Sequence, residues 1–597
     1  MLGMERKETL MGDLAAGPFD ALDRHWRWWL LLFWLAVGGF MIYSRWAAIE
    51  GFGLGDTDDN MRMMQVRGLL AGQGWYDLQQ HRLVGSNIHW SRLVDLPIAA
   101  LKLLFTPLFG GRTAETLAVT LAPLLPMLAA MAAAAVIARR LIHPLAFPLA
   151  VALLACAGSA KGMWQPLRID HHGWQLAMLA WAAASLTDPR RARGGVTLGL
   201  ATAGSLAIGI EMLLYLAAAG AITVLFWVRK ADEARRLFAY GVSLAGGCAF
   251  AFLVFASDAN RAPVCDALSP VWLSAMAAAG AVAVLLAWAS PKAPLARFGL
   301  AALAGAAVAL AFALTWPACL GRLDGSSPEL ERLWLSKVRE AMPIWRHGWQ
   351  ITTMTVTLPI CGLIGAAAML WRSRRDPNRL APWAGVTLLA AIAAGLLCWQ
   401  TRAGPAAQLL SIPGATALAW LVVGWASGLR TMRQRLLAAF VTISIVAGAY
   451  VAASWPRPPG PARRVVNIAN NRCPTLAALA PVARQRPGLV LTFVDLGPRL
   501  ITVTPHRAIT GPYHRNGAQI IDVMRTWRGD PDNARRTVER YRVDYVLICP
   551  NLSESTIYRS EAPNGFYIQL ARGKVPAWLE RVPLPENSPY RMWRVIR

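Results

Sequence analysis

A series of long apolar stretches, separated by short basic loops, constrains this chain more than any other feature. The 597 residues are 55% hydrophobic and only 16% charged, whereas about a quarter of the residues in a soluble protein are charged. An apolar helix of roughly 20 residues crosses ~30 Å of hydrocarbon. We therefore predict an α-helical polytopic membrane protein with about thirteen transmembrane helices. The predicted spans are 28–48, 115–138, 144–160, 173–187, 195–208, 210–228, 237–256, 271–290, 298–317, 350–371, 382–399, 405–427 and 436–454.

The loops between these spans alternate in charge. Basic residues recur at 139–140, 190–193, 229–236, 292–297, 372–379 and 430–435, which all fall on one side of the predicted membrane. The positive-inside rule makes this side cytoplasmic, together with the N-terminal head at 1–27. The net charge of +26 is thus spread over short loops. This distribution argues against a nucleic-acid partner, which would need one basic patch.

The opposite side receives three loops that carry candidate residues, a further loop near Cys265 and the C-terminal tail. The predicted membrane domain covers 28–455, with outer loops at 49–114, 161–172 and 319–349. The tail, 456–597, follows a proline-rich linker at 456–460. Within it, 489–493 and 545–548 are typical of buried strands, and 518–527 and 533–541 of helices. These patterns predict a small extracytoplasmic α/β domain.

Four of the eight cysteines fall on the outer side. Cys265 and Cys319 lie in outer loops, and Cys473 and Cys549 lie in the tail. An oxidising compartment favours two disulfides in these pairings. Four free thiols are the alternative, because sequence alone does not fix the connectivity of cysteines.

Acidic and imidazole groups lie just outside two of the predicted spans, on the outer face. Asp59 follows the first span, and Asp170 and His172 precede a later one. A carboxylate beside a bilayer is costly unless it binds a cation or takes part in chemistry. We predict that these three residues hold one divalent metal, Mg²⁺ or Mn²⁺ above all. For the neighbouring acids at 56 and 58, capping of a helix is the alternative role.

Other residues of the outer loops suggest contacts with a substrate. After Asp59, Met and Leu residues at 61, 64, 69 and 70 predict an amphipathic helix along the membrane surface. His89, Arg92 and Asp95 follow, and they are possible contacts for sugar hydroxyls or anchors at the interface. Glu211 lies inside an apolar stretch, which indicates either a functional carboxylate or a local exit to the surface.

Two charged residues lie farther along the chain on the same face. Glu340 belongs to the third outer loop. Arg402 lies at the outer end of a span, where it breaks the positive-inside pattern. A guanidinium group in this place can bind a phosphate or diphosphate, or its side chain can simply extend to the lipid headgroups.

In order and sidedness, these motifs resemble those of the GT-C superfamily of membrane glycosyltransferases. The most similar members are the catalytic subunits of oligosaccharyltransferases, of archaeal or bacterial type. The resemblance covers about 28–455. It rests on Asp59 with Gly74-Trp75, on the Asp-x-His pattern of Asp170-His171-His172, on Lys337-Val338-Arg339-Glu340, and on Arg402 before Pro405. The family's Trp-Trp-Asp-Tyr-Gly acceptor motif does not occur in 456–597.

The resemblance implies a metal-dependent glycosyltransferase of a bacterial inner membrane. Such an enzyme moves a sugar or oligosaccharide from a polyprenyl-(di)phosphate donor to an extracytoplasmic glycan, lipid or protein. Asp59 and Glu340 would position the acceptor, and Arg402 would bind the donor phosphate. A transporter or flippase for lipid-linked glycans, or a non-catalytic scaffold, are the competing functions. A transporter is expected to have charges deep in its spans and repeat symmetry.

Overall fold

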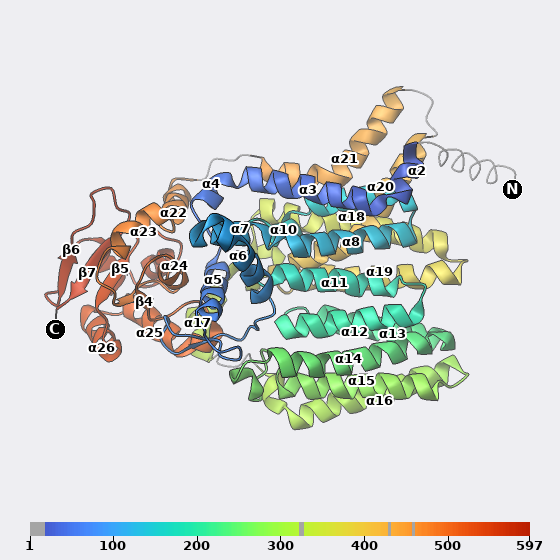
Figure 1. The fold of residues 1–597 in the computed structure, drawn as a ribbon, viewed down its shortest axis with the longest axis horizontal. Helices are drawn as coiled ribbons and strands as arrows, with labels where there is room; N and C mark the ends of the chain where they lie inside the picture. Colours follow the sequence, from blue (N-terminus) through green and yellow to red (C-terminus); the bar gives the residue numbers. More distant parts are fainter. Residues whose placement is uncertain (1–17, 322–326, 428–431, 456–459, 597) are drawn as a thin grey trace.

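A bundle of long helices with an α/β unit at one end makes up the molecule (Figure 1). The computed structural model describes residues 18–321, 327–427, 432–455 and 460–596. The first part of the predicted head, Arg430 and the linker residues 456–459 lie outside the described residues. The described chain is that of a multi-pass membrane protein, because its long helices are apolar and run side by side.

Helices occupy all thirteen stretches that the sequence analysis assigned to spans. Eight helical segments of the described chain are long and apolar enough to cross a membrane. The others are shorter or less apolar, so the count of thirteen crossings remains a prediction. The bundle helices are α3 (Trp26–Ser44), α7 (Gly111–Leu121), α8 (Leu124–Leu141), α9 (Phe147–Cys156), α11 (His172–Leu186), α12 (Arg191–Ile208), α13 (Leu213–Arg229), α14 (Ala234–Phe255), α15 (Pro270–Ala289), α16 (Pro294–Thr315), α18 (Trp349–Ser373), α19 (Pro377–Leu396), α20 (Gly404–Ser427) and α21 (Met432–Ser454). Shorter helices are α2 (Pro18–Arg24), α10 (Gly158–Gly162) and α17 (Pro328–Leu333).

Glycines allow close packing of two helices, α18, which follows the third outer loop, and α20, which follows Arg402. A Cβ atom added at Gly414 of α20 would lie 1.9 Å from the carbonyl oxygen of Gly362 of α18. Only glycine permits this approach, which is a common way for helices to associate in membranes. The two helices are therefore in direct backbone contact near their middles.

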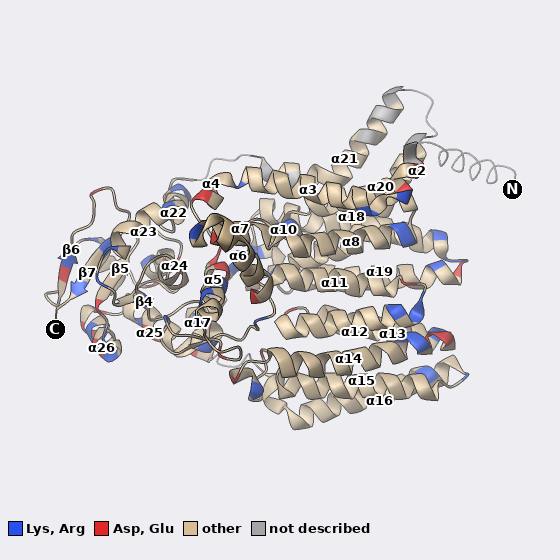
Figure 2. Cartoon of the chain, viewed as in Figure 1, with Lys and Arg blue, Asp and Glu red and all other residues tan. Residues whose placement is uncertain are grey.

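The two ends of the bundle differ in charge. Lys and Arg gather at the helix ends that lie away from the C-terminal unit (Figure 2). Acidic residues are more frequent at the other end, where the bundle meets that unit (Figure 2). This arrangement agrees with the alternation of basic and outer loops in the sequence.

The first outer loop is folded between the bundle and the C-terminal unit. It contains α4 (Trp46–Glu50), α5 (Thr57–Leu70), β1 (Gln79–Gln80), β2 (Ser86–Asn87) and α6 (Asp95–Phe109). The predicted helix after Asp59 exists as α5, and its position along the membrane surface stays a prediction. Residues 59–66 of α5 are buried on all sides, because α24 of the C-terminal unit packs on it from outside.

The C-terminal unit contains a five-stranded mixed sheet in the order β4-β3-β5-β7-β6. The strands are β3 (Leu489–Leu491), β4 (Arg507–Ala508), β5 (Tyr545–Ile548), β6 (Leu579–Val582) and β7 (Arg591–Val595). β3 pairs in parallel with β4 and β5, and β7 runs antiparallel to β5 and β6. The helices are α22 (Pro461–Arg472), α23 (Leu476–Ala483), α24 (Gly497–Val503), α25 (Gly517–Arg528), α26 (Pro531–Tyr541), α27 (Ser555–Glu561) and α28 (Phe566–Ala571). The two strands and two helices expected from the sequence are present.

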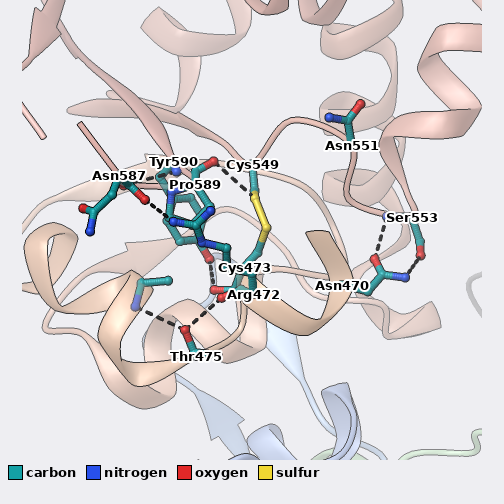
Figure 3. Close-up of a disulfide and its surroundings, with 12 residues drawn as sticks. Asn470, Arg472, Cys473, Thr475, Cys549, Asn551, Ser553, Asn587, Pro589 and Tyr590 are labelled. Carbon is teal, nitrogen blue, oxygen red and sulfur yellow. Dashed lines mark hydrogen bonds between the residues drawn. A yellow bond between two sulfur atoms is a disulfide. The ribbon is translucent and has the colours of Figure 1, made fainter. Parts of the chain in front are cut away.

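Both expected disulfides are formed. Cys265 pairs with Cys319, and Cys473 pairs with Cys549. Figure 3 shows the second bridge, which joins the end of α22 to the residue that follows β5. The hydroxyl of Tyr590 donates a hydrogen bond of 2.5 Å to the carbonyl of Cys473 (Figure 3). The bridge thus fastens the entry of the C-terminal unit to its central sheet.

Candidate active site

The acidic run at the start of α5 is where the first two outer loops meet. Asp56 caps the helix, because its carboxylate accepts a hydrogen bond of 2.8 Å from the backbone N–H of Asp58. A helix N-terminus carries a partial positive charge and stabilises acidic side chains in its first turn. The alternative role that the sequence allowed for Asp56 is therefore confirmed.

Asp59 is buried and joins the two loops. Its Oδ1 accepts hydrogen bonds from the backbone N–H groups of Ile169, at 2.8 Å, and Asp170, at 3.0 Å. Its Oδ2 lies 3.4 Å from Nη1 of Arg168. With 0% of its surface exposed, this residue contacts protein groups on every side. The structure thus gives Asp59 a role in holding the loops together.

Asp58, one residue earlier, is half-buried and differs from its neighbours. Its carboxylate makes no hydrogen bond or ion pair with any residue that the structure describes. Burial, together with the negative charges of Asp56 and Asp170, raises the pKa of Asp58 to about 8. A carboxyl group in this state lacks a cation, and its oxygen atoms suit Mg²⁺ or Mn²⁺. Asp58 is therefore a candidate metal ligand by its chemistry, although among the described residues the ligand atoms that lie within 4.8 Å of one another belong to His89, Asp266 and His514.

Asp170 and His172 lie beside this acidic run. Oδ1 of Asp170 accepts a hydrogen bond of 3.0 Å from the backbone N–H of His172, and Oδ2 lies 3.2 Å from Nδ1 of the same residue. Burial alone would raise the pKa of Asp170, but the charge of Arg168 outweighs it and lowers this pKa. A carboxylate that fixes one ring nitrogen of a histidine leaves the other free for a metal.

Arg168 is a site residue that the sequence analysis missed. It forms ion pairs with Asp56, with Asp59 and, at 2.7 Å, with Asp170. One guanidinium group thus serves three carboxylates and still leaves Asp58 without a partner. The sequence could have indicated Arg168 by its position. Like Arg402, it is a basic residue on the predicted outer side, where the positive-inside pattern leads one to expect few.

Glu340 and Arg402 form an ion pair with each other. Their segments are joined by the backbone, because Thr401 donates a hydrogen bond of 2.8 Å to the carbonyl of Met342. The charges of Glu340, Glu211 and Asp58 all act on Arg402. The structure therefore brings the acidic run, the Asp170 segment and the third outer loop to one region.

Of the three possible substrate contacts in the first outer loop, Arg92 and Asp95 are buried. The carboxylate of Asp95 lies 2.8 Å from Arg62 and 3.2 Å from Arg92. Arg92 also donates to the backbone carbonyl of Asp77 at 2.7 Å. These contacts hold the loop together and leave neither side chain open to a ligand, because both are at most 1% exposed.

His89 belongs to a different group. His89, Asp266 and His514 each offer a ligand atom within 4.8 Å of the others, so they could hold a metal ion. They come from the first outer loop, the segment after α14 and the C-terminal unit. Asp266 already accepts two hydrogen bonds from Arg515, at 2.8 and 2.6 Å. Its charge is therefore largely balanced by protein.

Known structures with a similar fold include oligosaccharyltransferases. The archaeal oligosaccharyltransferase AglB from Archaeoglobus fulgidus, in complex with an inhibitory peptide and a dolichol-phosphate, matches 93% of this chain over 73% of its own, with a TM-score of 0.63 and 12% identity. The chain has the fold of this oligosaccharyltransferase. The A. fulgidus enzyme tethered to an acceptor peptide containing the NVT sequon matches this chain with a TM-score of 0.62 and 14% identity, covering 94% of this chain and 76% of its own.

A third structure is that of the same A. fulgidus enzyme with other ligands. The A. fulgidus oligosaccharyltransferase in complex with Zn and sulfate matches 88% of this chain over 68% of its own length, with a TM-score of 0.55 and 12% identity. No family model matches the sequence, and no curated protein matches it. The similarity of this chain to the A. fulgidus enzyme is therefore a similarity of fold.

Proposed function

We propose that the protein is a membrane glycosyltransferase that uses a polyprenyl-phosphate or polyprenyl-diphosphate donor. Its acceptor is an extracytoplasmic glycan, lipid or protein, and its place is a bacterial inner membrane with the C-terminal unit in the periplasm. One observation supports this above all. The charge of a carboxylate without a partner, Asp58, acts on a cation at the bundle's outer end, Arg402.

Arg402 is the residue that binds the donor phosphate. It lies at the start of α20, at the edge of the apolar bundle, where a lipid-linked phosphate would arrive. Its present partner is the carboxylate of Glu340. A phosphate accepts a forked pair of hydrogen bonds from arginine, and a diphosphate also carries more negative charge than a carboxylate. Donor binding would therefore displace Glu340 and free it for the acceptor.

Asp58 takes over, in this proposal, the role that the sequence analysis gave to Asp59. The metal would be held by Asp58, Asp170 and His172, with Asp59 fixing the loops beneath them. A divalent cation bound there neutralises charge on a departing phosphate. The carboxylates of Asp58 and Glu340 orient the acceptor nucleophile and accept its hydrogen bonds. Holding both substrates at one membrane surface lowers the entropic barrier to their reaction.

Transfer of a labelled sugar tests this function. Purified protein is mixed with polyprenyl-linked donors extracted from the source cells, with and without EDTA. We expect a labelled product that is lost with EDTA and in Asp58→Asn, and kept in Glu50→Gln. Glu50 is exposed on α4, far from Arg402 in the sequence, and it serves as the matched control. Transfer by Asp58→Asn at the wild-type rate would refute the site, and no transfer by folded wild type would refute the function.

A further inference from the structure

One carboxylate of this region has no role so far. Glu211 lies in the short break between α12 and α13, at the outer end of the bundle. The preceding Gly209 is fully extended, with φ of 176°. A Cβ atom at this glycine would lie 2.3 Å from Oε2 of Glu211. The glycine therefore lets the carboxylate fold back over its own backbone, toward α11.

Two side chains from the start of α11 fix this carboxylate. Nε2 of His171 lies 3.0 Å from Oε1 of Glu211, and Nε2 of Gln175 donates a hydrogen bond of 2.6 Å to Oε2. Gln175 also donates to the carbonyl of Gly209, at 3.1 Å. His171 is itself packed between the rings of Trp90, at 5.1 Å, and His172, at 4.3 Å. The position of Glu211 is thus set before any substrate arrives.

Several polar atoms around Glu211 are buried without a partner. Among the described residues, Nδ1 of His171, Nε1 of Trp90 and Oε1 of Gln175 make no hydrogen bond. All three side chains are at least 98% buried. Each unsatisfied buried polar atom costs free energy. Two of the three atoms belong to His171 and Gln175, the side chains that hold Glu211, so these side chains have hydrogen-bonding capacity that the protein does not use.

The negative charge of Glu211 indicates which part of a lipid-linked donor it can bind. The carboxylate of Glu211 is 18% exposed, and its charge acts on His172 and Arg402. A carboxylate repels a phosphate, so it does not bind the part of the donor that Arg402 holds. Sugar hydroxyls, next along the donor, are neutral hydrogen-bond donors. A nearby negative charge also suits the positive charge that develops on a sugar ring during glycosyl transfer.

We propose that Glu211 binds a hydroxyl group of the sugar that is transferred. The inference rests on the proposed function and adds a residue that recognises the donor's saccharide. In this proposal, His171, the middle residue of the Asp170-His171-His172 run, positions the carboxylate of Glu211.

The test compares a glycosylated donor with the bare lipid phosphate. The KM for the labelled native donor pool and the inhibition constant of undecaprenyl phosphate are measured for wild type, Glu211→Gln and Glu50→Gln. Glu211→Gln keeps the shape and an acceptor for Gln175 but loses the charge. Losing a hydrogen bond to a charged group weakens binding about tenfold or more. We expect the KM to rise by about this factor, with the inhibition constant unchanged within roughly twofold.

Each other outcome counts against the inference. An equal rise in both constants would show that Glu211 acts on the phosphate site or on the fold, and no change in either would show that it touches no substrate. Wild type that neither transfers sugar nor binds undecaprenyl phosphate would refute the proposed function itself. Should Glu211→Gln fail to fold, Glu211→Asp keeps the charge beside His171 but withdraws it by one methylene, and the same separation of the two constants is expected.

Discussion

Asp59 of the first outer loop accepts a hydrogen bond of 3.0 Å from the backbone N–H of Asp170 in the second. Two metal-site candidates that are far apart in the sequence are therefore in direct contact. The contact uses the carboxylate of one and the backbone of the other, which leaves the carboxylate of Asp170 free for other partners. It also fixes the start of α5 relative to the start of α11.

We expect Asp59 and Asp58 to respond differently to mutation. Asp59→Ala leaves two buried backbone N–H groups unsatisfied and removes a partner of Arg168, so the free energy of unfolding should fall by about 3 kcal/mol or more. Asp58→Asn removes a repulsive charge and should keep or raise the stability while it abolishes transfer. Thermal unfolding in detergent and the transfer assay check both. Equal stability losses in the two variants would contradict this division.

Asp95 should prove structural. Asp95→Ala leaves the buried guanidinium groups of Arg62 and Arg92 without a counter-ion, which typically costs about 3–5 kcal/mol. Asp20→Ala is the control, since its pair with Arg24 is exposed and contributes at most about 1 kcal/mol. Denaturant unfolding measures the difference. A normal stability in Asp95→Ala with a raised KM would instead support a substrate contact.

Arg402 should decide the affinity for the donor phosphate. Arg402→Lys keeps the charge but loses the forked geometry, and Arg402→Ala loses both. We expect undecaprenyl phosphate to bind about tenfold or more weakly to the alanine variant, with an intermediate loss for lysine. Arg346→Ala, at an exposed position of the outer loop that contains Glu340, should bind as wild type does. Binding titrations in detergent provide the measurement.

Two groups of residues compete for a metal, and metal content separates them. Transfer should stop in EDTA and return with Mn²⁺ or Mg²⁺. His172→Ala should lower the metal bound per protein, measured by mass spectrometry of the metal. His514→Ala should not, because Arg515 already balances the charge of Asp266. Loss of the metal in His514→Ala alone would move the metal centre to His89, Asp266 and His514.

Local patterns of the sequence carried much of the architecture. Apolar stretches of sufficient length became the bundle helices, because a backbone in lipid must satisfy its hydrogen bonds within the segment. Runs such as 545–548 became buried strands, since β-branched and aromatic residues suit a pleated sheet. That the four outer cysteines form disulfides was also predictable, because cysteines on the predicted outer side meet an oxidising compartment. Only the fold fixes their pairing.

The exact residues of the candidate site depended on packing between distant segments. Neighbouring residues on a helix point about 100° apart, so whether Asp58 or Asp59 faces the open region is set by what packs on α5. The C-terminal α24 covers one side of that helix, and the Ile169–Asp170 backbone takes the carboxylate of Asp59. The burial of Arg92 and Asp95 likewise depends on Arg62, which the sequence gives no reason to connect with them.

The sequence by itself determined the membrane class of this protein, the side on which its acidic loops lie and the order of its motifs, because each of these follows from local composition and period. Only the tertiary structure decided that Asp59 is enclosed, that Asp58 is free, and that Arg168 and Glu211 belong to the same region. The physical reason is that the burial and charge of a side chain are set by neighbours from other segments, and no local pattern contains them.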